Sequence, residues 1–560
     1  SKLFKVNLKN GNADSSFGNN GFVDLHKGLG NNSSSLFVTM TSPGVIYKDL
    51  IIVGSSVSEG NPAAKGNIRA FDANTGDLKW TFNTIPEIGE DGYESYEDPD
   101  AYKRLGGANA WAGLTLDGKR GILYAPTGSV SYDFYGGDRV GDNLFANSII
   151  ALNAANGKKI WHFQTVHHDV WDRDLPTPPV LFDYSINDSV IPSLAQVTKS
   201  GYIYLLNRIT GKPIYRIIER DVPSKSNLIG ETLSKTQPIP SFPEPFSRQS
   251  LTIEDINPFV LERERDSLIK VFSSISKDHM FSPPSEEGTL IFPGFDGGAE
   301  WGGPALDPIK NKLYINSNEM PWILTMKKVS NTSSQGMNIY NKQCLMCHGI
   351  DYKGSGENPS ILNLSSRYNF NELSSLIING KGLMPGFKFL DDQKIEKIVD
   401  YIINLKDGDK TNILDVNEEV YYTSTGYNKF LTNDGYPAIN PPWGTLNSIN
   451  LNTGKLDWKI PLGQTDIGVK NNILTGTENY GGPIITKSGI IIIAATADNK
   501  IRAFNSENGD LLWDEDLPFS GFATPSYYEI DGNPYIAIAA GGGKLGTKSG
   551  DKYIVFSITK

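Results

Sequence analysis

The stretch that decides the fold reads Ala70-Phe71-Asp72-Ala73-Asn74-Thr75-Gly76-Asp77-Leu78-Lys79-Trp80. Its pattern is an apolar run that ends in Asp or Asn, a turn that carries glycine, and an aromatic residue that begins the next run. Four further segments align with it, namely 151–161, 205–215, 448–458 and 503–513. Five copies in register predict a repeated unit, read most simply as one four-stranded sheet per repeat. The terminal ring would pack between neighbouring sheets, so that a ring of sheets buries a continuous core. The sequence therefore predicts an all-β propeller.

A second motif, Cys344-Leu345-Met346-Cys347-His348, indicates covalent attachment of a c-type haem. Cys344 and Cys347 would bond the haem vinyl groups, and His348 would be one axial ligand of the iron. Met384, in a Gly/Pro loop similar to the distal-ligand loop of class I cytochromes c, is the predicted second ligand. The alternatives are a zinc or redox site and a core methionine, but zinc takes about four ligands. The chain has only 2 cysteines.

The sequence changes character around the haem motif. Helical periodicity predicts a compact three-helix module over 337–343, 371–378 and 391–405. Elsewhere the chain consists of short apolar or alternating runs broken by turn residues, such as 50–54, 121–125, 202–206 and 489–495. We therefore expect a first propeller part over 1–331, an all-α cytochrome c insert over 332–412 and a last propeller part over 413–560.

The repeats resemble the tryptophan-docking motifs of the eight-bladed propellers of PQQ-dependent quinoprotein dehydrogenases, over 1–331 and from about 440 to 560. Three segments, 163–176, 300–303 and 494–499, are most similar to the membrane-bound glucose dehydrogenase branch. The resemblance implies an eight-bladed ring whose N-terminal part is missing from this chain, together with any signal peptide or membrane helix. Membrane association is therefore left open, although no run here approaches the roughly 18 apolar residues of a transmembrane helix.

The resemblance also implies the catalytic residues. Asp172 matches the catalytic aspartate, which can take the proton of a substrate hydroxyl as hydride leaves the carbon. Lys199 matches a basic residue that hydrogen-bonds a quinone oxygen and stabilises its charge. The alternatives are a turn-capping aspartate, since Asp169 and Asp174 are neighbours, and a surface lysine.

The cofactor and metal contacts follow in the same way. Trp111 matches the tryptophan on which the flat PQQ stacks, although a core tryptophan is the alternative. Glu59 matches a ligand of Ca²⁺, or of Mg²⁺ in its place. Ser129 stands where relatives have a second, asparagine ligand, so the metal and its full ligand set stay open. Polar contacts to PQQ are expected from Thr41, Ser56 and Asn316.

Composition narrows the class of partner and the compartment. The 560 residues carry 63 acidic against 52 basic side chains, for a net charge of -11, which argues against a nucleic-acid partner. Covalent haem and the resemblance both imply a periplasmic protein.

Together these features predict a PQQ-dependent dehydrogenase that oxidises a sugar, such as glucose, or a polyol. Electrons would pass from PQQ to haem c and on to a soluble cytochrome or a membrane quinone. The glucose branch has Gly-Gly-His-Gly near its C-terminus, whereas this chain has Gly541-Gly542-Gly543-Lys544, so the substrate stays open. A quinohaemoprotein alcohol dehydrogenase is the first alternative, and a non-catalytic propeller carrier or scaffold is the second.

Overall fold

The structure is a computed structural model that describes residues 1–30, 33–186, 189–329, 335–354, 358–382, 384–409 and 421–557. The predicted insert boundaries at 332 and 412 lie outside these residues.

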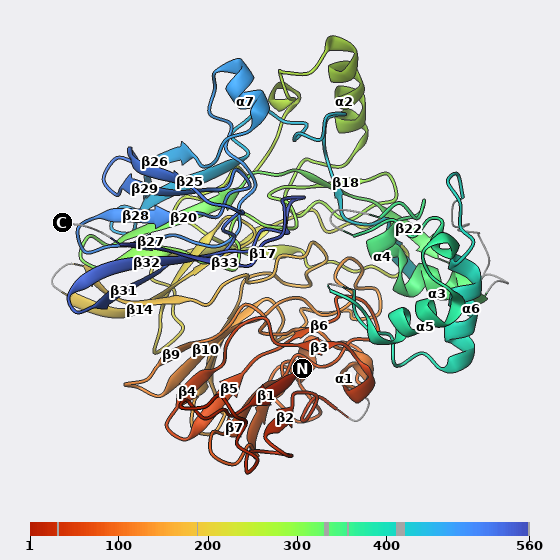
Figure 1. Cartoon of the computed structure of the whole chain (residues 1–560), viewed down its shortest axis with the longest axis horizontal. Helices are drawn as coiled ribbons and strands as arrows, with labels where there is room; N and C mark the ends of the chain where they lie inside the picture. The colour runs from red at the N-terminus through yellow and green to blue at the C-terminus, as the bar shows by residue number, and fades with distance from the viewer. Residues whose placement is uncertain are drawn as a thin grey trace.

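Sheets of four antiparallel strands form the regular part of the fold (Figure 1). Their strands are β4 (Val45–Tyr47), β5 (Leu50–Val53), β7 (Ile68–Asp72) and β8 (Leu78–Phe82); β9 (Thr115–Asp117), β10 (Ile122–Pro126), β11 (Ser148–Asn153) and β12 (Lys159–Gln164); β19 (Ala305–Asp307), β20 (Lys312–Asn318), β25 (Gly444–Asn450) and β26 (Lys455–Pro461); and β27 (Ile484–Ile485), β28 (Ile490–Ile493), β29 (Lys500–Asn505) and β30 (Leu511–Asp516).

Smaller sheets complete the β structure. Those of three strands are β13 (Val180–Ile186), β14 (Ser189–Val197) and β15 (Ile203–Asn207); β18 (Thr289–Ile291), β21 (Trp322–Leu324) and β24 (Asn428–Lys429); and β31 (Ser526–Ile530), β32 (Asn533–Ala540) and β33 (Lys552–Ser557). Those of two are β1 (Lys2–Phe4) with β2 (Phe22–Asp24), β3 (Val38–Thr39) with β6 (Ser56–Val57), β16 (Ile217–Asp221) with β17 (Thr236–Pro240), and β22 (Met326–Val329) with β23 (Tyr421–Ser424).

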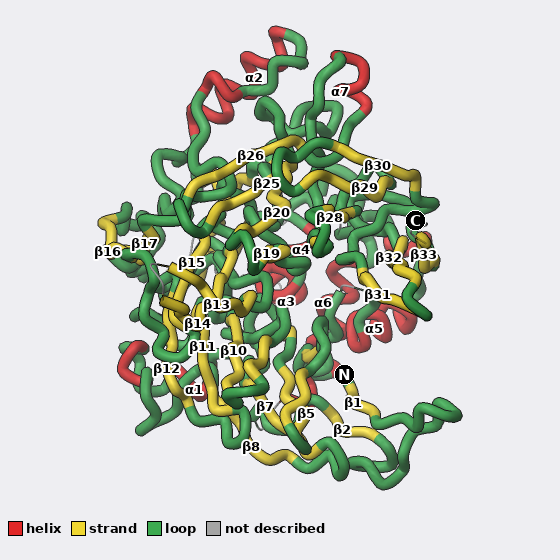
Figure 2. The backbone as a smooth tube through the Cα atoms, turned by 90° about the vertical axis from the view of Figure 1, so that its left-hand side faces the viewer, coloured by secondary structure: helices red, strands yellow, loops and turns green. Residues whose placement is uncertain are grey.

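Apolar clusters join each main sheet to the next. One cluster spans the β4–β8 and β9–β12 sheets, a second spans β9–β12 and β13–β15, and a third spans β13–β15 and the sheet of β19, β20, β25 and β26. A fourth cluster joins the sheet of β19, β20, β25 and β26 to β27–β30, and a fifth joins β27–β30 to β31–β33. Figure 2 shows these sheets arranged around a common centre. The predicted propeller is confirmed, while the number of eight blades stays a prediction.

The five repeats form the same turn in the structure. The glycine N–H of each turn donates to the carbonyl of the Asp or Asn that ends the strand, at 2.8 to 2.9 Å, in Gly76, Gly157, Gly211, Gly454 and Gly509. All five glycines have φ between +69° and +78°. This is the left-handed region that other residues adopt at a cost.

The aromatic ring of one blade docks on the turn of the next. The indole N–H groups of Trp80, Trp161 and Trp458 donate to Ala154, Arg208 and Ser506 carbonyls at 3.3, 3.1 and 3.1 Å. A Cβ added to the facing glycine would lie only 2.5 Å from the Trp80 ring at Gly157 and 2.7 Å from the Trp161 ring at Gly211. The predicted inter-blade packing is therefore present, and glycine is required by both backbone and contact.

The haem motif lies in a helical module, as predicted. Its helices are α3 (Gln335–Gln343), α4 (Leu345–His348), α5 (Phe370–Asn379) and α6 (Asp392–Ile402). The predicted third helix ends three residues early, and the CxxCH motif itself forms the short α4. The predicted apolar face of α6 is buried, through Ile395, Ile398, Val399 and Ile402. In Figures 1 and 2, seen at 90° to each other, the module lies against one face of the ring.

The propeller part also contains helices that the sequence analysis did not predict. They are α1 (Ala101–Arg104), α2 (Glu262–Ser274) and α7 (Asp466–Asn471), with short 3-10 turns η1 (Ser33–Ser35), η2 (Tyr93–Ser95) and η3 (Ile253–Asp255). Another 3-10 turn, η4 (Leu364–Ser366), lies in the helical module. In α2, Leu268 and Phe272 are the buried residues, and Phe272 stacks on Phe430 at 6.3 Å. Across the residues that the structure describes, no helix is long and apolar enough to cross a membrane.

Replacing a docking tryptophan should weaken the ring. Trp161→Ala would empty a buried site and remove one of two hydrogen bonds to the Arg208 carbonyl, which also accepts from the Tyr124 hydroxyl, so we expect a loss of about 3–5 kcal/mol in the free energy of unfolding. Urea unfolding followed by fluorescence measures this loss. Trp513→Ala is the matched control, because Trp513 is 39% exposed against 8% for Trp161. Equal losses in the two variants would contradict the docking role.

Candidate functional site

Asp172 and Lys199 form a buried ion pair, with Nζ 2.7 Å from Oδ1. Burial raises the pKa of the Asp172 carboxyl and the charges of Asp174 and Glu59 add to this effect, whereas Lys199 opposes it. Burial acts to lower the pKa of Lys199, but the charges of Asp172 and Asp174 outweigh it and raise that pKa. The lysine therefore stays cationic beside a carboxyl group whose affinity for a proton is raised.

Asp169, rather than Asp172, caps the turn that contains both. The Asp169 carboxylate accepts from the backbone N–H groups of Trp171 at 2.9 Å and Arg173 at 2.6 Å. Asp172 instead has φ +56° and turns its side chain to Lys199. A left-handed aspartate costs conformational free energy, and such residues cluster at functional sites. The turn-capping alternative thus applies to Asp169 and not to Asp172.

Trp111 is held in place at both ends. Its indole Nε1 donates to Asp174 Oδ2 at 2.7 Å, and its carbonyl accepts from the Thr41 hydroxyl at 2.8 Å. The other Asp174 oxygen accepts from the Ser129 N–H at 2.7 Å. Trp111 is only partly buried, which fits a platform for a flat cofactor better than a core tryptophan. The sequence analysis missed the positioning role of Asp174, for which the one signal was its place two residues after Asp172.

Acidic groups gather beside this platform. Burial raises the pKa of the Asp133 carboxyl well above its usual range, and the charges of Glu59, Asp172, Asp174 and Asp169 raise it further. Such an excess of carboxylates, of which Asp133, Asp169 and Asp172 are buried, fits a hard divalent cation, which prefers oxygen ligands. The described residues nevertheless include no group of three His, Cys, Asp or Glu side chains placed to hold a metal ion. Glu59 accepts from the Tyr427 hydroxyl.

The hydroxyl of Ser129, the second predicted metal ligand, forms hydrogen bonds with two carboxylates. It lies 2.6 Å from Asp169 Oδ2 and 3.0 Å from Asp174 Oδ1. The arrangement shows a supporting role for Ser129, and metal ligation by this residue stays a prediction.

Asn316 and Ser56 lie on strands next to this group. The buried Asn316 amide donates to Asn479 Oδ1 at 2.7 Å and to the Gly481 carbonyl at 3.0 Å. Backbone hydrogen bonds from Gly298 to Lys199 and from Asn318 to Gly298 join its strand to the ion pair. Ser56 pairs with Thr39 between β3 and β6. The fold thus brings the predicted PQQ contacts into one region without testing their roles.

The predicted haem residues lie in the helical module. His348 Nδ1 lies 2.9 Å from the Pro359 carbonyl, so Nδ1 is the donor and Nε2 is left available for the predicted ligation of iron. Burial lowers the pKa of His348 and so favours its neutral form. Cys344 and Cys347 are not joined by a disulfide, and burial raises the pKa of each thiol to about 12. Met384 packs against the same apolar core as Cys344.

The haem motif adjoins the acidic group of the propeller. The Glu59 charge contributes to the raised pKa of Cys347. Gln343 Nε2 donates to the Asn61 carbonyl at 2.9 Å. Tyr427, which follows the insert and bonds Glu59, also packs edge-on against Phe134 and Phe295 at 5.9 and 5.6 Å. The sequence analysis missed Tyr427, because no motif marks an aromatic residue whose partners are distant in the chain.

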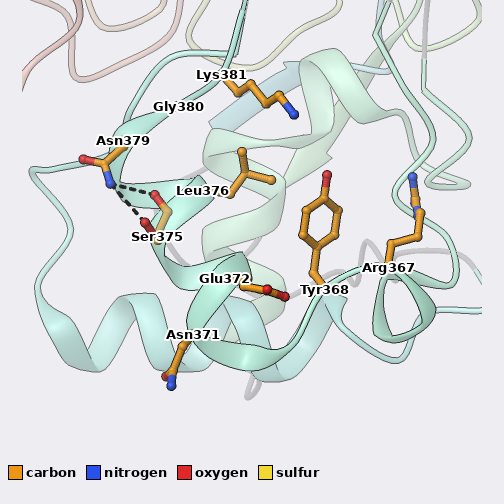
Figure 3. A pocket seen from close by; sticks show the side chains of 9 residues that line it. All are labelled: Arg367, Tyr368, Asn371, Glu372, Ser375, Leu376, Asn379, Gly380 and Lys381. Carbon is orange, nitrogen blue, oxygen red and sulfur yellow. Dashed lines mark hydrogen bonds between the residues drawn. The ribbon is translucent and has the colours of Figure 1, made fainter.

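A cavity of about 620 Å³ lies elsewhere in the helical module (Figure 3). It is lined by Arg367, Tyr368, Asn371, Glu372, Ser375, Leu376, Asn379, Gly380 and Lys381. None of the predicted haem ligands lines it, so this cavity does not define the candidate site.

Propeller and haem module together define a quinoprotein joined to a cytochrome c, and the comparisons agree. The family model "Glucose/ethanol/alcohol dehydrogenase, beta-propeller domain" matches residues 1–354 and 371–536. A second model, "Cytochrome C oxidase, cbb3-type, subunit III", matches 331–402. The chain therefore belongs to the PQQ-dependent dehydrogenase family and carries a cytochrome c domain.

Similar proteins include quinate/shikimate dehydrogenase (quinone) of Acinetobacter baylyi, 31% identical, and quinoprotein glucose dehydrogenase of Escherichia coli, 30% identical. Each match covers 100% of this chain and 62% of the relative, so the chain spans less than two thirds of these proteins. Quinohemoprotein alcohol dehydrogenase from Comamonas testosteroni shares the fold, with a TM-score of 0.58, 18% identity, and coverage of 99% of this chain and 64% of that one.

Glu300 is a further buried acid near Lys199. Burial raises the pKa of its carboxyl from 4.5 to about 8 and Asp296 adds to this effect, whereas Lys544 and Lys199 oppose it. Glu300 is therefore largely protonated at neutral pH.

Glu300→Gln should flatten the dependence of stability on pH. In the unmodified protein, the folded state holds a proton that the unfolded state releases above about pH 4.5. Stabilisation by this proton is complete below that pH and is lost as the pH rises towards about 8, by at most about 1.4 kcal/mol per pH unit. Urea midpoints across this range measure the slope. The exposed Glu515→Gln serves as control, and an unchanged slope in Glu300→Gln would refute the assignment.

Met384→His should lower the haem reduction potential and remove the charge-transfer band of methionine-ligated ferric haem, because thioether ligation raises the potential. Optical redox titration of the haem-loaded protein measures both. Met346→Leu is the control, because Met346 lies inside the CxxCH motif. It should leave both the reduction potential and the charge-transfer band unchanged. The reverse pattern would show that Met384 is a core residue.

Proposed function

We propose that this protein is a PQQ-dependent dehydrogenase that oxidises a sugar, such as glucose, or a polyol and passes the electrons to its own haem c. The observation that carries the proposal is the buried Asp172–Lys199 pair, which shares Asp174 with the Trp111 platform through charge and a hydrogen bond. A scaffold has no need of a buried, left-handed aspartate that is paired with a lysine.

The chain's own residues would divide the work. Trp111, fixed by Asp174 and Thr41, would carry the cofactor, with Asn316 and Ser56 as polar contacts. Asp172 Oδ would accept the hydroxyl proton of the substrate, and the Lys199 ammonium would stabilise negative charge nearby. When bound, PQQ supplies the oxidant for the substrate carbon and haem c supplies the one-electron relay. Glu59 and the acidic group beside it would hold Ca²⁺ or Mg²⁺.

The internal relay is supported by the junction between the two domains. The Glu59 charge acts on Cys347, and Gln343 of α3 donates a hydrogen bond to the Asn61 carbonyl of the propeller. Tyr427, on the chain that returns from the module, bonds Glu59 within the propeller. Haem bonded at Cys347 would therefore lie beside the proposed metal ligand. Electrons would leave to a soluble cytochrome or a membrane quinone, and we place the reaction in the periplasm.

The relatives limit the substrate only to a class. Their names give glucose, quinate or shikimate, and glycerol as substrates, all of which carry CH–OH groups. A substrate with several hydroxyl groups is therefore the best supported, and an alcohol dehydrogenase is the alternative.

Asp172→Asn should slow haem reduction by substrate about 10²- to 10⁴-fold, the usual contribution of a general base. Stopped-flow absorbance of protein loaded with PQQ and calcium, mixed with glucose, other aldoses or primary alcohols, measures the rate. Asp221→Asn, at the exposed end of β16, is the control. Reduction only by alcohols would favour the alternative dehydrogenase, and no reduction by any of these would favour a carrier or scaffold.

A further inference from the structure

Lys544 brings a cationic group to the rim of the candidate site. It stands in the segment where the glucose branch has Gly-Gly-His-Gly and follows β32. Its Nζ lies over the Tyr480 ring at 3.6 Å and near the Trp301 ring at 5.3 Å, and the two rings are stacked on each other at 5.1 Å. Loops from three blades thus meet at this ammonium group.

The ammonium group of Lys544 has no carboxylate partner within 4.0 Å among the described residues. Glu300 is the acid whose pKa the Lys544 charge lowers. Burial and the Asp296 charge outweigh that effect, so Glu300 is largely protonated at neutral pH. Glu478, a further acid near Tyr480, is instead paired with Lys429 at 2.7 Å. The rings hold the cation by cation–π attraction and leave it able to take an anion.

Lys544 also lies on the side of the catalytic pair. Lys199 and Lys544 both act on the Glu300 carboxyl, so Glu300 is near each of them. Tyr480 adjoins Gly481, whose carbonyl accepts from Asn316 at 3.0 Å. A substrate that extends along Glu300 from one lysine to the other could therefore place one hydroxyl at Asp172 and a negatively charged end at Lys544.

From this arrangement we propose that Lys544 binds the carboxylate of the substrate, so that the preferred substrate is a polyhydroxy acid rather than a neutral sugar. The inference rests on the proposed dehydrogenase function and narrows its substrate class. A carboxylate on a lysine ammonium gains a charge-assisted hydrogen bond, whereas a neutral sugar at the same place would gain only an ordinary one. The ammonium and the aromatic rings would fix the acid at one end, and Asp172 would select the hydroxyl that reacts.

The test compares matched acids and neutral analogues on protein loaded with PQQ, calcium and haem. The probes are a trihydroxycyclohexanecarboxylate with its methyl ester, and D-gluconate with D-glucitol. We expect a KM about ten- to hundredfold lower for an acid than for its analogue, the range of one charge-assisted hydrogen bond. Lys544→Gln should remove this preference by raising KM for the acids, with neutral substrates changed less than about twofold. Lys544→Arg should retain it.

Lys548→Gln is the matched control, because Lys548 belongs to the same loop but lies over Phe519, at 5.6 Å. Equal KM values for acid and analogue in the unmodified protein would overturn the proposal, as would equal effects of Lys544→Gln on both, which is what a purely structural lysine predicts. Calorimetric titration with the cyclic acid measures binding without turnover. If haem is reduced by no CH–OH compound, the proposed function fails, yet acid binding that Lys544→Gln abolishes would still support the anion site.

Discussion

The fold depends on one contact, the docking of an aromatic ring on the glycine turn of the next blade. Trp80, Trp161 and Trp458 each fill the space above a turn and bond one of its carbonyls. Where the third repeat has Tyr215, its hydroxyl bonds the Leu451 carbonyl at 2.6 Å in the same manner. Because each blade is fixed to the next, loops that are distant in sequence are held at fixed positions around the centre of the ring.

The centre of that ring concentrates negative charge at a cost. Glu59, Asp133, Asp172 and Asp174 influence one another, while Lys199 is bonded to only one of them, Asp172. Buried like charges destabilise the fold unless a cation or protons compensate them. The same arrangement favours a bound divalent cation and a carboxyl group that accepts a proton. The electrostatic cost to folding and the proposed chemistry therefore come from the same carboxylates.

The cytochrome module is inserted where it can act on that centre. It separates β20, which ends at Asn318, from its partner β25, which begins at Gly444. The sheet closes across the insertion, so the module is attached to the propeller through both of its ends. Tyr427 on the returning chain then reaches Glu59, and Gln343 on α3 reaches Asn61. The position of the haem is therefore set by the blade itself.

The sequence by itself determined the propeller, the haem attachment and the helical insert, because each follows from local spacing: the repeat of ring and glycine, CxxCH, and the apolar face of α6. It also indicated Asp172 and Lys199 by resemblance. Only the tertiary structure decided that Asp169 caps the turn, that Asp174 fixes Trp111, that Tyr427 bonds Glu59, and that Lys544 lies on Tyr480. These residues are far apart in the chain or carry no motif, and their roles arise from burial and charge that only packing creates.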